Sequence, residues 1–76
     1  MNAKRRREIK KIKEQLSDLA LKLEELKDQE QEAYDNLPES LQQGERGEKM
    51  ESAINELDEV INDLQYADDK LETAME

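Results

Sequence analysis

The sequence predicts an all-α fold, an antiparallel two-helix coiled-coil hairpin that dimerises into a four-helix bundle. Three observations lead to this prediction. Apolar side chains recur every three and four residues in both halves of the chain, the single proline and both glycines lie in the middle, and the two ends carry opposite charge. Alternating steps of three and four are typical of helices that pack along a shared seam.

The first predicted helix covers about residues 2–36. Its large aliphatic side chains follow one another at steps of 3, 4, 3, 4 and 3 residues, at Ile9, Ile12, Leu16, Leu19, Leu23 and Leu26. The same steps continue to Glu30, Ala33 and Leu37, so the stripe weakens at one position and then resumes. A repeat of this length favours coiled-coil packing over packing on a sheet.

The joint is predicted at about residues 37–47. Pro38 ends the first helix near Asn36, because proline has no amide proton and its ring clashes with the preceding turn. Proline suits a first helical position, so residues 38–41 are expected to form one isolated turn. A connection this short implies antiparallel helices, and it places the centre of the hairpin near Gln42 or Gln43.

The second predicted helix covers about residues 48–75, with a start between Gly44 and Glu48. Glu45 precedes Lys49 by four residues, the favourable orientation for a helical ion pair. A seven-residue pattern then repeats over residues 53–59 and 60–66. It produces one apolar row at Met50, Leu57, Leu64 and Leu71, and a second at Ala53 and Ile54, Val60 and Ile61, Ala67, and Ala74 and Met75.

Three apolar positions in seven make this stripe wider than one neighbouring helix covers. We therefore expect a homo-oligomer, most simply a dimer, with Leu21, Val60 and the alanine rows between protomers. The alternative is a monomeric hairpin stabilised by a larger, unidentified protein partner. The side chains expected in core or oligomer packing are Ile9, Ile12, Leu16, Leu19, Leu23, Leu26, Met50, Ile54, Leu57, Ile61, Leu64 and Leu71.

Charge is distributed unevenly along the chain, whose formal net charge is −9. Residues 1–13 hold seven basic side chains and one acidic one, whereas the other 63 residues hold five basic and 20 acidic ones. Both helix ends oppose their own macrodipoles. An antiparallel hairpin would compensate by bringing the two ends together. The pairs expected there join Arg5, Arg6 and Lys13 to Asp68, Glu72 and Glu76.

Two alternatives give these charges a function. The basic cluster, defined as Lys4, Arg5, Arg6, Arg7, Lys10, Lys11 and Lys13, would bind phosphates of a nucleotide or nucleic acid. Acids near residues 68–76 compete for the same cations, and no aromatic side chain lies nearby to stack on a base. In the other alternative, carboxylates of the second helix imitate nucleic-acid phosphates toward a protein that handles DNA or RNA.

Missing residue types exclude most catalytic chemistry. The chain has no histidine and no cysteine, so it lacks the usual nucleophile systems, thiolate or imidazole metal ligands, and disulfides. We expect no enzyme activity and no cofactor, and a packing role for Tyr34 and Tyr66 beside the apolar stripes. No apolar run approaches the length of a membrane span, and the basic start leads into charged rather than apolar sequence, so we expect no membrane partner and a cytoplasmic location.

The joint and the following helix carry a resemblance. The resemblance is carried by residues 34–42, by the segment Glu45-Arg46-Gly47-Glu48 and by the pattern Ala53-Ile54-x-x-Leu57. This part of the chain resembles small helical-hairpin proteins encoded by bacteriophages and mobile elements of bacteria. The resemblance covers about residues 30–65. It implies a prophage or phage accessory protein that acts by binding. Inhibition of a host defence system or sequestration of its nucleotide signal would suit such a protein, although neither role follows from the residues. No binding residue carries over from it.

Overall fold

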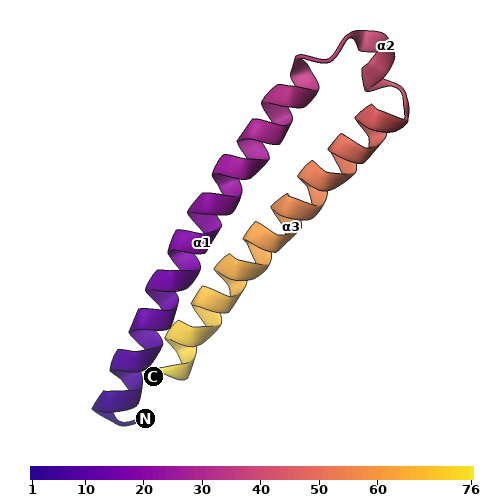
Figure 1. The fold of residues 1–76 in the computed structure, drawn as a ribbon. Helices are drawn as coiled ribbons and strands as arrows, with labels where there is room; N and C mark the ends of the chain where they lie inside the picture. The colour runs from indigo at the N-terminus through magenta and orange to yellow at the C-terminus, as the bar shows by residue number, and fades with distance from the viewer.

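The chain folds as two long antiparallel helices joined by a short one (Figure 1). The computed structural model describes all 76 residues, with α1 at Ala3–Asp35, α2 at Glu39–Gln42 and α3 at Glu45–Ala74. The Cα atoms extend over 58 × 15 × 11 Å, so the molecule is an elongated rod. Both termini lie at one end and α2 lies at the other (Figure 1). The predicted all-α antiparallel hairpin is confirmed.

The helix boundaries follow the break at Pro38. α1 ends at Asp35, and the expected isolated turn forms as α2, where the amide of Leu41 donates to the carbonyl of Pro38 at 2.8 Å. Pro38 is the N-terminal cap of α2 rather than its first helical residue. α3 begins at Glu45, within the expected window and three residues before the predicted boundary. Acidic side chains at Glu45 and Glu48 support this start, because the amino end of a helix favours negative charge.

Gly47 allows α2 to pack directly against the first turn of α3. It is buried, and a Cβ atom added to it would overlap the carbonyl group of Gln42, whose carbon would lie only 2.5 Å away. Gln42 is also tied to α1, since its side-chain amide donates to the carbonyl of Tyr34 at 3.0 Å. The absence of a side chain at Gly47 therefore lets all three helices meet at the joint.

The core between α1 and α3 is thin. Ile61 and Ile54 are the buried apolar side chains, the former only 3% exposed, and Ile9, Leu16, Leu23, Leu57 and Leu64 are half-buried around them. The predicted seam of α1 does not pack as one stripe. Its second row stays largely in contact with solvent, with Ile12 46%, Leu19 49% and Leu26 53% exposed.

The second row of the seam is exposed because α3 lies to one side of it. The first row of α1, at Ile9, Leu16 and Leu23, faces α3. The residues four positions after each of these, Lys13, Ala20 and Lys27, also face α3. They are therefore covered, whereas Leu19 and Leu26 are not. Within one hairpin, therefore, only part of the residues expected in core or oligomer packing are covered, and the expected packing of Ile12, Leu19 and Leu26 in an oligomer stays a prediction.

The two tyrosines differ in their surroundings. Tyr34 is half-buried, whereas Tyr66 is 63% exposed and does not pack in the core. The ammonium of Lys70 lies 5.6 Å from the centroid of the Tyr66 ring, an exposed cation–π contact. The expected packing role therefore holds for Tyr34 and is wrong for Tyr66.

Candidate functional site

One edge of the contact between α1 and α3 is polar. Three pairs of side chains form this polar edge: Lys13–Glu72 at 2.5 Å, Tyr34–Glu51 at 2.6 Å and Lys27–Asp58 at 2.9 Å. The two residue numbers of each pair add to 85, so the register is centred between residues 42 and 43. This confirms the expected centre of the hairpin. Pairs of this kind contribute little stability individually, but they favour one register over slipped ones.

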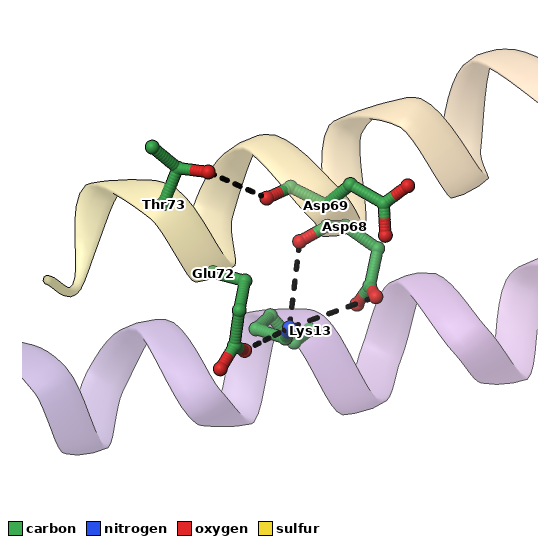
Figure 2. Close-up of polar contacts among 5 residues, drawn as sticks. All are labelled: Lys13, Asp68, Asp69, Glu72 and Thr73. Atoms are coloured by element: carbon green, nitrogen blue, oxygen red, sulfur yellow. Dashed lines mark hydrogen bonds and ion pairs between the residues drawn. The ribbon is translucent and has the colours of Figure 1, made fainter.

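Lys13 is the most connected residue of the polar edge (Figure 2). Besides Glu72, its ammonium lies 3.6 Å from a carboxylate oxygen of Asp68 and donates to the backbone carbonyl of Asp68 at 3.4 Å. The hydrogen bond that Lys13 donates to the carboxylate of Glu72 raises the pKa of Lys13, and the same bond lowers the pKa of Glu72. Nearby, the hydroxyl of Thr73 donates to the carbonyl of Asp69 at 3.4 Å (Figure 2).

The other two polar pairs shift pKa values in the same way. The hydrogen bond to Asp58 raises the pKa of Lys27, and the hydrogen bond to the carboxylate of Glu51 raises the pKa of Tyr34. Away from this edge, the predicted helical ion pair between Glu45 and Lys49 forms at 3.2 Å and is exposed. The three pairs of the polar edge join α1 to α3 at the molecular surface, where they orient the two helices without forming an enclosed site.

We expect the Lys13–Glu72 pair to make stability depend on acid pH. The folded-state pKa of Glu72 is lowered, so its contribution is present above the ordinary value of 4.5 and is lost as pH falls through the lowered value. Thermal melts between about pH 5 and pH 3 should therefore show a smaller loss of Tm for Glu72→Gln than for the wild type. Glu76→Gln, which removes an exposed acid without an ion pair, should behave like the wild type. Equal pH dependence in Glu72→Gln and the wild type would contradict the role of this pair.

The opposite side of the hairpin is an apolar face. In α1 the exposed row, Ile12, Leu19 and Leu26, lies three residues after Ile9, Leu16 and Leu23. The residues of the polar edge lie four residues after the same positions. Because positions three and four residues later lie on either side of the starting position on a helix, the exposed row and the polar edge lie on opposite sides of the contact with α3. In α3, Val60 and the half-buried leucines likewise lie away from Asp58 and Glu72. The apolar face consists of Ile12, Leu19, Leu26, Ala33, Ala53, Leu57, Val60, Leu64, Ala67 and Leu71.

Leu21 does not belong to the apolar face. It is 60% exposed and, with Ala20 and Gln65, lines a shallow groove on the side of the polar edge. The residue numbers of Ala20 and Gln65 also add to 85, so these residues lie level with each other on the polar edge. They form no fourth polar pair, because alanine has no polar side-chain group. Because Leu21 and Val60 lie on opposite faces, one two-fold contact cannot cover both. The expectation that both pack between protomers stays a prediction, and it requires more than one contact between copies.

The basic cluster lies at the end of the rod that holds the termini (Figure 1). Of the expected pairs, only those of Lys13 form. The guanidinium of Arg6 donates to the backbone carbonyl of Met75 at 3.0 Å rather than to an acid, and Arg5 has no ion pair. One of the free backbone amides at the amino end of α1 also has a partner, because the side-chain oxygen of Asn2 accepts a hydrogen bond from the amide of Arg5 at 2.9 Å.

Two further features are not found in the structure. No three acidic side chains lie close enough together to hold a metal ion. None of the helices combines the length and apolar character that crossing a membrane requires.

The fold and surface define a class of protein, the elongated all-α helical hairpin, with one polar edge and one exposed apolar face. Comparison with protein families, curated proteins and solved structures finds no match to the chain. The resemblance of residues 30–65 to phage-encoded helical proteins stays a prediction.

Proposed function

We propose that the protein is a non-enzymatic coiled-coil protein that acts through protein contacts, and that its first partner is a second copy of itself. The observation that supports this is the apolar face. Three large aliphatic side chains of α1 recur there every seven residues, each about half exposed, and Val60 of α3 is 44% exposed beside them. Removing such a row from water is favourable by about 25 cal/mol per Å². Two apolar faces brought together form a four-helix bundle.

A pair of leucines on opposite faces provides the test. Leu19 belongs to the apolar face and Leu21 does not, yet both are exposed in the single hairpin, at 49% and 60%. We expect Leu19→Asp to abolish assembly, because it would place a carboxylate in the apolar contact, and Leu21→Asp to leave assembly unchanged. Light scattering and sedimentation measure the mass directly. A wild-type mass of 8.9 kDa at micromolar concentration, or equal loss of assembly in both variants, would contradict the proposal.

The resemblance at the joint suggests a use for such a bundle. A phage accessory protein of this kind would present its outer helix surfaces to a host protein and inhibit it. The strongly acidic outer surface, with a chain net charge of −9, favours a basic target. A pull-down from the bacterial host with the wild type, compared with the monomeric Leu19→Asp variant, would show whether the partner recognises the assembled form.

A second candidate function is phosphate binding by the basic cluster. It is favoured by one observation, that Lys4, Arg5, Arg7, Lys10 and Lys11 form no ion pair in the hairpin. Acids lie close to the inner part of the cluster, however, since Lys10 and Lys13 share a shallow depression with Glu14, Asp18 and Asp68. Titration with oligonucleotides and cyclic nucleotides at two salt concentrations tests this function. Binding that is insensitive to salt, or unchanged when Arg5, Arg6 and Arg7 become Gln, would exclude it.

A further inference from the structure

We infer that the second copy lies antiparallel on the apolar face, with the basic end of each hairpin over the acidic end of its partner. This inference rests on the self-association proposed above and specifies its geometry. Two features of the single hairpin support it: the separation of charge along the rod and the symmetry of the apolar face.

The hairpin is electrically polar along its length. At the terminal end, residues 1–13 contribute a net +6 and residues 68–76, with four acids and Lys70, contribute −3, which leaves +3. At the loop end, residues 30–52 hold seven acids and two basic side chains, which gives −5. These two ends lie at opposite extremes of a rod 58 Å long (Figure 1).

The charges at the ends select the orientation of the second copy. The repulsion between two chains of net charge −9 is present in either orientation, so it favours neither. A parallel dimer places +3 beside +3 and −5 beside −5, whereas an antiparallel dimer places +3 beside −5 at both ends. The ends are several Debye lengths apart at physiological ionic strength, where that length is about 8 Å, so each acts mainly on its immediate neighbour. Opposite charges at both ends therefore favour the antiparallel dimer.

The midpoints of the apolar face on α1 and on α3 lie at the same level along the rod, as an antiparallel dimer with a two-fold axis at that level requires. On α1 it extends from Ile12 to Ala33, with its midpoint between residues 22 and 23. On α3 it extends from Ala53 to Leu71, with its midpoint at residue 62. Residues 23 and 62 add to 85, so the register of the hairpin puts both midpoints at one level. A two-fold axis at this level brings Leu19 over Leu26 of the partner subunit and Ile12 over Ala33 of the partner subunit.

The apolar face lies within a side of the rod that is large enough to contact a second copy. From Ile12 to Ala33 the apolar face extends over about 32 Å, at a rise of about 1.5 Å per residue. The whole side of the rod that carries it measures 58 × 15 Å, about 870 Å². Stable protein interfaces of standard size bury about 800 Å² on each partner, which is comparable to this side of the rod.

Spin labels on the full chain test the orientation, because the native sequence has no cysteine. Glu8→Cys and Lys22→Cys place labels on one helical stripe, 14 residues apart, beside the apolar face. In the antiparallel dimer, residue 22 lies at the two-fold axis, so its two labels should be within about 20 Å of each other. The two labels at residue 8 should be about 45 Å apart, from a rise of about 1.5 Å per residue.

The outcomes separate the two proposals. A long distance at residue 8 together with a short one at residue 22 supports the antiparallel dimer. Similar distances at the two sites would overturn it in favour of a parallel dimer, while leaving self-association intact. Labelled protein that shows no intermolecular distance, with a mass of 8.9 kDa in the same sample, would overturn self-association and this inference together.

Discussion

Replacement of Ile61 by aspartate is expected to unfold the hairpin. Ile61 is 3% exposed and lies between α1 and α3 at the middle of the rod. Truncation of such a side chain to alanine alone costs about 2–5 kcal/mol, and a buried carboxylate without a partner adds a further penalty. A protein of this size has a total stability of about 4–11 kcal/mol. The far-ultraviolet circular dichroism of Ile61→Asp should therefore lose most of its helical signal at 25 °C.

The neighbouring residue supplies the control for this substitution. Asn62 is exposed on the same turn of α3, so Asn62→Asp adds the same charge at nearly the same level without burying it. We expect its circular dichroism and Tm to stay close to those of the wild type. A helical signal and Tm retained by Ile61→Asp would show that the two helices do not pack through this residue.

Gly47→Ala is expected to destabilise the joint, although alanine is the better helix former. Intrinsic propensity alone would favour alanine by about 1 kcal/mol inside a helix. The added Cβ, however, would overlap the carbonyl group of Gln42, and relief of that overlap requires a shift of backbone rather than of a flexible side chain. Overpacking of this kind costs about 1–3 kcal/mol. We expect the overlap to dominate and Tm to fall by about 5–10 °C, because 1 kcal/mol shifts Tm by about 4–8 °C in a domain of this size.

The second glycine makes this prediction specific. A Cβ on Gly44 would meet its nearest neighbour, the carbonyl oxygen of Leu41, at an ordinary contact distance of 3.6 Å. Its backbone, with φ of −89°, is accessible to any residue. Gly44→Ala should therefore change Tm by no more than a few degrees. A Tm for Gly47→Ala at or above that of the wild type would mean that α2 does not approach α3 as closely as described.

Much of the fold follows from local features of the sequence. Pro38 breaks the helical repeat, and the short joint around it requires the chain to turn back, which fixes the hairpin and its centre. The pairing of Lys13 with Asp68 and Glu72 follows from that centre and from the charges at the two ends. The ion pair between Glu45 and Lys49 depends only on their spacing. Each of these features needs no knowledge of how the helices are rotated.

The apolar pattern does not predict how α1 is rotated about its own axis relative to α3. Leu16 and Leu19 are both large and aliphatic, so hydrophobicity alone does not say which row of α1 faces α3. The register contains a signal that decides it. With the centre between residues 42 and 43, Lys27 lies level with Asp58 and Lys13 lies level with Glu72, and these opposite charges turn α1 so that Leu19 faces away.

The role of Gly47 in the packing of the joint could not be predicted from the sequence, for a different reason. A glycine near a predicted helix start is equally consistent with the end of the joint and with the first turn of the helix. Its requirement arises from the approach of Gln42, a contact between α2 and α3 that no periodic pattern encodes. Likewise, Tyr66 is the last residue of the second seven-residue repeat, and only the rotation of α3 shows that its ring is exposed.

The central claim is that one face of the hairpin is covered by a second copy and the other is not. Solvent paramagnetic relaxation of leucine methyl groups in the wild-type protein tests this most directly. Leu19 and Leu21 are both accessible in the single hairpin, so a soluble paramagnetic agent would relax both strongly in a monomer. At concentrations where the mass doubles, we predict that Leu19 and Leu26 become protected while Leu21 stays accessible. Equal relaxation of Leu19 and Leu21 at every concentration would contradict the account.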